Sequence, residues 1–449
     1  MLDDWSTSHN DIMRIYRSKR DAARGTVQSK YNILGFISSG TYGRVYKAQS
    51  LDQEGKIHAI KKFKPDKEGD VITYTGISQS AIREIALNRE ISHDNVVALK
   101  EVILEDKSIY MVFDFAEHDF LQVIHHHSQT LRYPISMPVL KSLIYQLING
   151  LIYLHSCHIL HRDLKPANIL ITSNGVVKIG DLGLARLIYE PLQPLFAGDK
   201  VVVTIWYRAP ELLLGAKHYN KAIDCWAVGC VIAELASLRP IFKGEEAKLD
   251  SKKNVPFQRD QLLRIFEVLG TPDEAGWPRI VHMPEYNNMK RLDRYPSRLH
   301  EWCQTRIRSQ QGYDLLRQLF SYDPDRRLTA KEALQHPWFH EEPLPTWNAF
   351  QSAGSHQIPP HRRITQDDAP SMMPVPAQNN SHPHLLGGGG IGGGITGPGA
   401  PFAQAQTSKS GSSTSFTSVS GGGGGVYGGQ APTGSSGRGQ GARKKARLN

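Results

Sequence analysis

Two motifs in the middle of the sequence carry the side chains best suited to chemistry. H-R-D-L-K-P-A-N, residues 161–168, follows a predicted helix, and Asp181 opens a D-L-G motif after the next short strand. Transfer of a phosphoryl group to a hydroxyl needs a carboxylate that orients the hydroxyl and accepts its proton, and Asp163 fits this role. Lys165 can reach the transferring group. The oxygens of Asn168 and Asp181 are hard ligands suited to Mg²⁺.

A glycine-containing turn and a strand lysine precede these motifs. The turn S-S-G-T-Y-G-R-V, residues 38–45, can bring backbone N–H groups close to phosphates, although by itself an ordinary hairpin turn explains it better. Lys61 lies on a predicted strand, and Glu84 on the following helix is a candidate partner for its charge. Both could equally be exposed residues. The ordered set of glycine turn, Lys, Glu, H-R-D-x-x-x-x-N, D-x-G and A-P-E is far more specific than any one part.

Strands and then helices must position these residues. Alternating apolar runs predict strands at Tyr31–Ile37, Arg44–Ala48, Lys56–Phe63, Val97–Leu104 and Ser108–Phe115. Helical periodicity predicts helices at Ser80–Ile91, Met137–His155, Tyr219–Ser237, Arg259–Leu269, Gln310–Phe320 and Thr329–Leu334. A strand-rich lobe followed by a helix-rich lobe is an α+β arrangement, and the cleft between lobes is where ligands bind.

In this order the motifs resemble those of eukaryotic protein kinases over roughly residues 31–340. The resemblance implies a bilobal fold, with an antiparallel β-sheet N-lobe, a mainly helical C-lobe, and ATP bound with Mg²⁺ between them. Its implied catalytic residues are Asp163, Lys165, Lys61, Glu84 and Thr204, and its implied metal ligands are Asn168 and Asp181. The residues implied to bind ATP are Ile37, Ser38, Ser39, Gly40, Thr41, Tyr42, Gly43, Arg44, Val45, Lys61, Asp114 and Ala116.

The resemblance also implies contacts that support the site. Glu211 would pair with Arg327, Asp224 would bind the backbone of the catalytic loop, and Phe113 would stand behind the adenine. The sequence departs from the kinase pattern where Ser38 replaces the first glycine of the loop. The two glycines nearest the phosphates remain, so ATP binding is still expected.

Two segments are similar to cyclin-dependent kinases: the helix S-Q-S-A-I-R-E, residues 78–84, and V-T-I-W-Y-R, residues 203–208. Leu182 in place of Phe, and Asp199 where a phosphothreonine normally stands, resemble the Mediator-associated members, which pair with cyclin C. This resemblance implies a nuclear, proline-directed serine/threonine kinase bound to a cyclin C-like cyclin and Mediator kinase-module subunits. Its substrates would be transcription proteins, including the repeated tail of RNA polymerase II, and its effect would often be repression.

Other functions remain open at this point. The chain could be a catalytically dispensable scaffold that binds a cyclin, or a cell-cycle or mitogen-activated kinase. As an enzyme, it would need Glu84 to swing inward to Lys61, so low activity is expected without cyclin. A helix at Ile12–Ala23 carries basic residues that could meet an acidic cyclin face, or it could be a solvated helix.

Composition sets the remaining expectations for a chain of 449 residues with net charge +10. No apolar run approaches the roughly 18–20 residues that cross a bilayer, so no membrane partner is expected. The four cysteines form no C-x-x-C pair, which argues against a disulfide scaffold or zinc site. Of the 40 glycines, 22 lie in residues 341–449, which predicts a disordered tail after a kinase domain at 31–340 and a helical extension at 1–30. The basic C-terminus suggests nuclear import; no specific nucleic-acid binding is expected.

Overall fold

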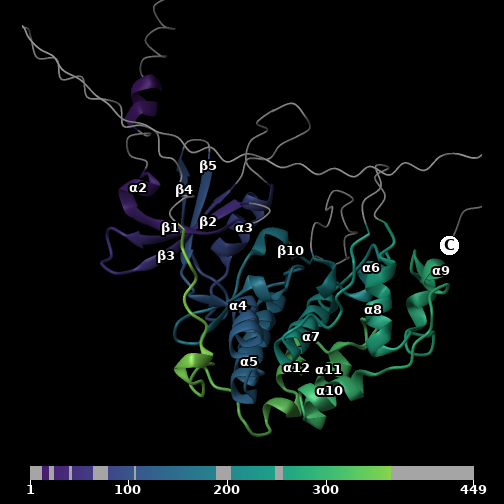
Figure 1. The fold of residues 1–449 in the computed structure, drawn as a ribbon. Coiled ribbons are helices and arrows are strands. Elements are labelled where there is room, and N and C mark those ends of the chain that lie inside the picture. The colour runs from purple at the N-terminus through teal and green to yellow at the C-terminus, as the bar shows by residue number, and fades with distance from the viewer. Residues whose placement is uncertain are drawn as a thin grey trace, which may run out of the picture. The chain divides into compact units, whose positions relative to one another are not determined.

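The computed structural model describes residues 13–19, 25–39, 43–63, 79–105, 108–188, 204–247 and 256–365. Its first lobe is built on an antiparallel sheet of five strands in the order β1-β2-β3-β5-β4, visible in Figure 1. The strands are β1 (Tyr31–Ser39), β2 (Gly43–Ser50), β3 (Ile57–Phe63), β4 (Leu99–Glu105) and β5 (Ser108–Asp114). Two helices, α2 (Val27–Lys30) and α3 (Gln79–Glu90), accompany this sheet.

Each face of the five-stranded sheet has its own apolar cluster. Successive side chains of a strand point to opposite faces. On β5, Val112 packs in one cluster with Val27 of α2, whereas Met111 and Phe113 pack in the other with Ala81 of α3. The sheet therefore holds α3 against the face that leads into the second lobe.

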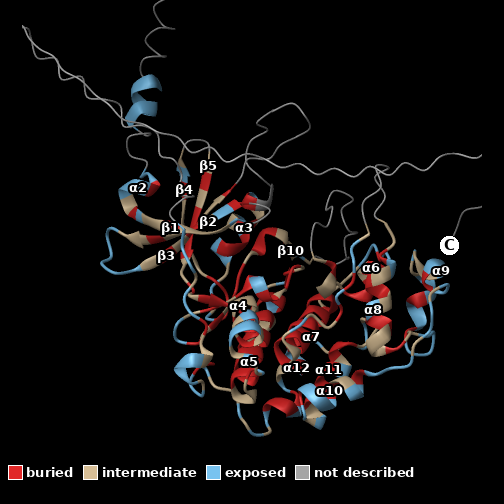
Figure 2. Ribbon diagram, in the orientation of Figure 1, coloured by how far each residue is buried: buried red, intermediate tan, exposed pale blue. Residues whose placement is uncertain are grey.

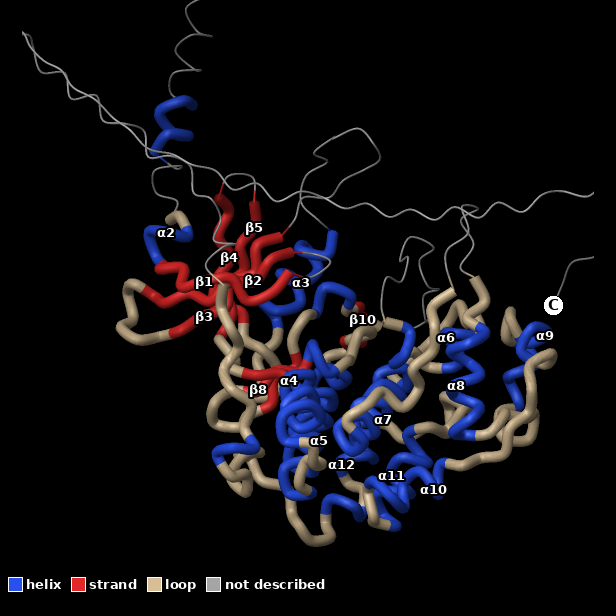
Figure 3. Tube along the Cα trace, in the orientation of Figure 1, coloured by secondary structure: helices blue, strands red, loops and turns tan. Residues whose placement is uncertain are grey.

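The second lobe is mainly helical, and Figure 3 separates its helices from the strand-rich first lobe. Its helices are α4 (Phe120–His125), the π-helix η1 (His126–Leu131), α5 (Met137–Ser156), α6 (Pro210–Leu213), α7 (Ala222–Ser237), α8 (Arg259–Leu269), α9 (Tyr286–Met289), α10 (Leu299–Arg306), α11 (Gln310–Leu319) and α12 (Ala330–Leu334). Its short strands are β6 (His118–Asp119), β7 (Ile159–Leu160), β8 (Ile169–Ile171), β9 (Val177–Ile179) and β10 (Arg186–Leu187). The predicted bilobal α+β fold is thus confirmed.

The centre of this lobe is formed by α5 and α7, which Figure 2 shows as largely buried. Within α7 every residue from 222 to 236 is buried. Among the described helices, α5 alone has the length and hydropathy of a membrane span, so the expectation that no segment approaches this composition was wrong. Of its apolar window 67% is buried inside the lobe, as a central core helix requires.

The predicted helices and strands differ from the observed ones mainly at their ends. Arg259–Leu269 has the predicted bounds, while the helix predicted from Tyr219 begins at Ala222. The prediction missed α4, whose six residues F-L-Q-V-I-H are too few to show a helical period, and α10, whose apolar residues show little helical periodicity. In the N-terminal extension, residues 13–19 are helical and exposed, and the rest of the predicted helix lies outside the described residues.

The chain continues in contact with both lobes beyond the boundary expected at residue 340. We call residues 341–365 the C-terminal strap; Figure 1 shows it in green. Ala349 and Phe350 are buried in the apolar core of the second lobe. At its end, Thr365 exchanges two backbone hydrogen bonds with Phe36 of β1, at 3.0 and 3.1 Å. The strap contains large apolar side chains that can be buried, and the glycine-rich sequence that follows has few of them. Residues 366–449 lie outside the described part.

We expect Phe350→Ala to destabilise the folded domain by about 3–5 kcal/mol, because a buried aromatic ring is lost and leaves a cavity. Leu344→Ala is the control, since Leu344 lies in the same strap but is 50% exposed. Thermal or denaturant unfolding of the full chain measures both. Equal, small shifts of the unfolding midpoint in the two variants would mean that the strap contributes no core packing.

Candidate active site

Lys61, Glu84 and Asp181 meet between the two lobes. The Lys61 Nζ of β3 lies 2.7 Å from Glu84 Oε2 on α3 and 2.9 Å from Asp181 Oδ1. Burial lowers the pKa of Lys61, but the two carboxylates outweigh burial and hold this pKa above its ordinary value. The pair between Lys61 and Glu84 is therefore closed in the chain alone. This contradicts our expectation that Glu84 must first move inward.

The catalytic loop places one carboxylate for proton transfer. Asp163 Oδ2 accepts hydrogen bonds from Lys165 Nζ at 2.8 Å and Asn168 Nδ2 at 2.9 Å. Asp163 Oδ1 is buried and accepts no hydrogen bond from any residue in the described ranges. A buried acceptor without a donor is costly, and a substrate hydroxyl would supply the missing bond. The geometry therefore fits Asp163 as the group that accepts the hydroxyl proton.

Asp224 of α7 stabilises a strained turn in this loop. The backbone of Arg162 has φ 70°, in the left-handed region that non-glycine residues rarely adopt. Asp224 accepts hydrogen bonds from the backbone N–H groups of His161 and Arg162, both at 2.9 Å, and from His155 Nε2 at 3.0 Å. Burial raises the pKa of Asp224, but the hydrogen bond from His155 and further partners outweigh burial and lower it. The carboxylate thus remains charged and holds the loop.

His161 connects the catalytic loop to the strand before Asp181. Its Nδ1 accepts from the backbone N–H of Asp163 at 3.2 Å, so Nε2 carries the proton and donates to the Gly180 carbonyl at 2.9 Å. Sequence reasoning included His161 in a motif without giving it a role. Its two bonds fix the distance between the proton acceptor and the metal-binding segment.

The two predicted metal ligands have oxygens available. Asn168 donates through Nδ2 to Asp163, and its Oδ1 accepts no hydrogen bond from the described residues. Asp181 gives only Oδ1 to Lys61. Burial raises the pKa of Asp181, but the charge of Lys61 outweighs burial and lowers it, so a carboxylate is present. One amide and one carboxylate oxygen suit a divalent metal that neutralises phosphate charge.

The sheet register brings most of the predicted nucleotide-binding residues together. Ser38 of β1 lies opposite Val45 of β2, and Val45 lies opposite Lys61. The described residues of this set are Ile37, Ser38, Ser39, Gly43, Arg44, Val45 and Lys61 on β1 to β3, Asp114 at the end of β5, and Ala116 just after it. Gly40, Thr41 and Tyr42 lie outside the described residues.

Gly43 has a structural reason to be glycine. A Cβ atom at this position would collide with the carbonyl oxygen of Lys62 on β3. The close approach of β2 and β3 therefore requires glycine here even without a nucleotide. Gly43 alone is accordingly weaker evidence for phosphate binding than its place in the loop suggests.

Two sequence differences have clear positions in the structure. Leu182, which stands where kinases usually have Phe, is fully buried in the core of the second lobe and leaves Asp181 directed at Lys61. Thr204, a predicted catalytic residue, makes no side-chain hydrogen bond with any described residue. The structure thus joins the other four predicted catalytic residues in two pairs, Lys61 with Glu84 and Asp163 with Lys165. It does not connect Thr204 to either pair. Asp199 lies outside the described residues.

Contacts that support the site come from distant parts of the sequence. Arg327 binds Glu211 with two parallel hydrogen bonds of 2.8 and 3.0 Å, as the resemblance implied, and both side chains are buried. Sequence reasoning missed Arg362 of the strap, which pairs with Asp119 at the start of α4. Residues 243 positions apart give no local signal of such a contact.

A sequence model of the protein kinase domain matches residues 31–339. The chain is 58% identical over 363 residues to serine/threonine-protein kinase ssn3 of Emericella nidulans, covering 76% of this chain and 85% of that one. It is 57% identical over 363 residues to SSN3 of Aspergillus oryzae, covering 76% and 87%. With ssn3 of Neosartorya fischeri it shares 56% over 375 residues, covering 78% and 88%. The chain therefore belongs to the protein kinase family and is a serine/threonine-protein kinase.

Proposed function

We propose that this kinase is cyclin-dependent and proline-directed, and that it acts in the nucleus within the Mediator kinase module. It transfers the γ-phosphate of ATP, with Mg²⁺ on Asn168 and Asp181, to transcription proteins that include the RNA polymerase II C-terminal repeat, often repressing transcription. The observation that carries phosphoryl transfer is the unpaired Asp163 Oδ1 beside Lys165. The cyclin, Mediator and substrate assignments rest on the sequence resemblance and on the relatives' similarity.

The surface of α3 supports a cyclin partner. Ala81 and Glu84 face inward and are buried, while Ile82 between them is 52% exposed. An exposed β-branched apolar side chain on a helix whose other face positions Glu84 is suited to a protein contact. Because Lys61 and Glu84 are already joined, a cyclin bound here would hold α3 in place.

We expect Ile82→Glu to weaken cyclin binding about tenfold or more, because a carboxylate placed in an apolar contact loses its hydration, and about 1.4 kcal/mol is enough for a tenfold change. Leu51→Glu is the matched control. Leu51 is 57% exposed and follows β2, whereas α3 contacts β4. In the sheet, β3 and β5 lie between β2 and β4. Titration of the full chain with a cyclin C-like cyclin measures both affinities. Equal affinities of the two variants would contradict the proposed surface.

A transfer assay separates the enzyme from a scaffold that only binds a cyclin. Labelled ATP is supplied with a Ser-Pro peptide or with the same peptide carrying Ser-Ala, each with and without cyclin. We expect transfer to the Ser-Pro peptide, raised by cyclin. Equal labelling of both peptides would refute proline direction, and rates unaffected by a bound cyclin would refute cyclin dependence.

A further inference from the structure

Strained backbone occurs in two places. Six non-glycine residues in the described ranges have left-handed φ values. Three of them, His158, Arg162 and Asp181, belong to the catalytic loop and its surroundings. The other three, Arg132 (φ 58°), Leu238 (φ 60°) and Arg308 (φ 55°), all line one pocket in the second lobe.

Helices often end in this conformation, but usually on glycine. A bulky residue in this conformation is strained, and such strain concentrates at functional sites. Finding three such residues around a single pocket marks it as a place where these side chains are needed.

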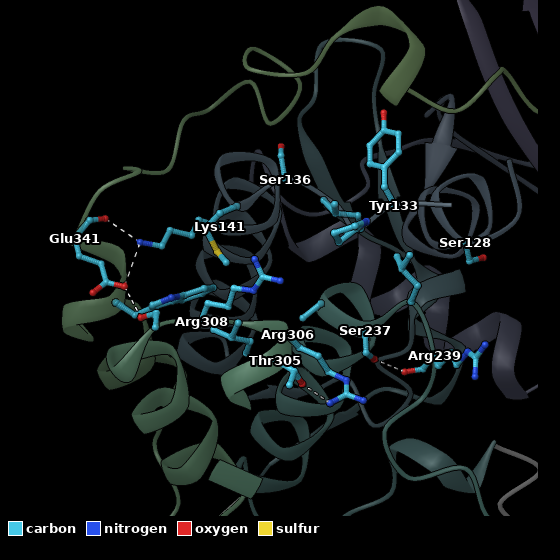
Figure 4. A pocket seen from close by; sticks show the side chains of 18 of the residues that line it. Ser128, Tyr133, Ser136, Lys141, Ser237, Arg239, Thr305, Arg306, Arg308 and Glu341 are labelled. Atoms are coloured by element: carbon cyan, nitrogen blue, oxygen red, sulfur yellow. Dashed lines mark hydrogen bonds and ion pairs between the residues drawn. The ribbon is translucent and has the colours of Figure 1, made fainter. Parts of the chain in front are cut away.

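The pocket has a volume of about 1140 Å³ and lies between the start of α5, the end of α7, α10 and the start of α11. Figure 4 shows side chains from these separate segments gathered around it. Five basic residues line the pocket, against two acidic ones. The basic residues are Arg132, Lys141, Arg239, Arg306 and Arg308, and the acidic ones are Glu341 and Glu342.

Some of this charge is already engaged. Lys141 is 1% exposed, donates to the Glu341 carbonyl at 2.8 Å, and lies 3.7 Å from the Glu341 carboxylate. Arg306 donates to the carbonyl of Trp302 at 3.1 Å and to the hydroxyl of Thr305 at 2.9 Å. Figure 4 marks the contacts of Lys141 with Glu341 and of Arg306 with Thr305 as dashed lines.

Three guanidinium groups remain without a counter-ion. The side chains of Arg132, Arg239 and Arg308 are exposed and make no hydrogen bond or ion pair with any residue that the structure describes. Three like charges around one hollow repel one another, and an anion between them would remove this repulsion. Arginine binds carboxylate and phosphate alike with two parallel N–H groups, but a phosphate carries about −1.5 to −2 charges and three acceptor oxygens, so one phosphate can serve more than one arginine.

Two helices point their positive ends at the same pocket. Ser136 and Met137 at the start of α5 line it, as do Ser309 and Gln310 at the start of α11. The first N–H groups of a helix lack partners within the helix and favour anions. At α11 part of this capacity is used: the Gly312 N–H donates to Ser309 Oγ at 3.0 Å, and Ser309 Oγ donates to the Glu341 carboxylate at 2.6 Å. The start of α5 is the more open of the two. Ser136 Oγ makes no capping bond and no other hydrogen bond in the described chain. The C-terminal end of α7 also lines the pocket and carries partial negative charge, which opposes the helix starts. The net positive charge of the pocket therefore comes from the arginines.

We propose that this pocket binds a phosphorylated segment of a protein chain. Clusters of arginine are a common way to recognise phosphopeptides. The pocket is slightly larger than the roughly 300–1,000 Å³ typical of small-ligand sites, and it also exposes apolar lining that a peptide's side chains can cover. Arg132, Arg239 and Arg308 line one pocket together with apolar residues, a setting that suits a phosphate on a peptide better than a nucleic-acid backbone.

The length of α5 relates this pocket to the active site. A helix of 20 residues spans about 30 Å, and α5 runs from the pocket to the residues that precede the catalytic loop. An extended chain covers this distance in about nine residues. Taken with the proposed function, a substrate already phosphorylated nine or more residues from its target serine can occupy both sites at once.

Direct binding tests the pocket without relying on activity. The probe is a fluorescent 12-residue peptide with one phosphoserine, and the variant is R132N/R239Q/R308N in the full chain. Asparagine tolerates left-handed φ, so the charge is removed with little added strain. We expect affinity to fall tenfold or more in the variant. R279Q is the control, because Arg279 is exposed, pairs with Asp325, and does not line the pocket.

Three results would overturn the proposal. In the first, the unphosphorylated peptide or its Glu version binds the wild-type chain as tightly as the phosphopeptide. In the second, an oligonucleotide of equal charge binds more tightly than the phosphopeptide. In the third, the triple variant binds the phosphopeptide as tightly as the wild-type chain. A kinetic assay adds the link to substrate choice: KM should rise only for a long substrate bearing the distant phosphoserine, while a short Ser-Pro peptide is phosphorylated normally. If wild type phosphorylates neither substrate, the proposed function fails, but the binding result still decides the pocket.

Discussion

Asp163→Asn should lower the rate of phosphoryl transfer by about 10²–10⁴-fold and leave ATP affinity nearly unchanged. The substitution keeps the shape of the side chain but removes the basic carboxylate. In the structure Oδ2 is held by Lys165 and Asn168, so Oδ1 is the oxygen left for the substrate hydroxyl. Single-turnover rates with cyclin bound, together with nucleotide titration, separate the two effects.

Asn168→Asp is the companion variant, because it keeps an oxygen at the metal position but removes the Nδ2 donor to Asp163. We expect it to retain more activity than Asp163→Asn, since the proton acceptor is still present. Near-normal turnover of Asp163→Asn at equal folded protein would show that another group accepts the proton.

A large effect on stability is also expected from Arg327→Met. Removing one partner of a buried ion pair typically costs about 3–5 kcal/mol, because the other charge stays buried without compensation. The Arg327 side chain is fully buried against Glu211, and it also donates to the carbonyls of Ser321, Ala222 and Tyr322. Denaturant unfolding of the full chain, followed by fluorescence and circular dichroism, measures the loss.

Arg279→Met is the matched control for this prediction. Its pair with Asp325 has a similar length, 3.0 Å, but the two side chains are 74% and 53% exposed. Exposed pairs contribute about 0–1 kcal/mol. A destabilisation by Arg327→Met no larger than that of the control would mean that the buried pair is relieved by structural relaxation.

The chemistry of the active site could be predicted from sequence because its motifs are local. The groups around Asp163 and Asp181 each lie within a few residues, so spacing alone indicates which side chains meet. Lys61 followed from its place on a predicted strand, whereas Phe113 was implied by the kinase resemblance; the structure places them on the paired strands β3 and β5. The closed pair of Lys61 and Glu84 could not be predicted, because it depends on how α3 packs on the sheet.

The strap and the arginine pocket had no comparable signal. Phe350 lies just beyond the expected boundary of the kinase domain, in a region whose average composition is dominated by the glycines that follow. The residues that form the pocket come from four segments spread between Ser128 and Glu342, and each arginine alone reads as a solvated charge. Only the backbone conformation and the convergence of the segments distinguish them.

The strap also has a consequence for the release of ADP. Its last described residue, Thr365, is hydrogen-bonded to β1 of the first lobe, while Arg362 pairs with Asp119 and Phe350 is anchored in the second lobe. In many enzymes, opening to release product limits turnover. Any separation of the lobes here must stretch the strap or break its pairing with Phe36. The residues after the kinase domain can therefore set how quickly the enzyme exchanges its nucleotide.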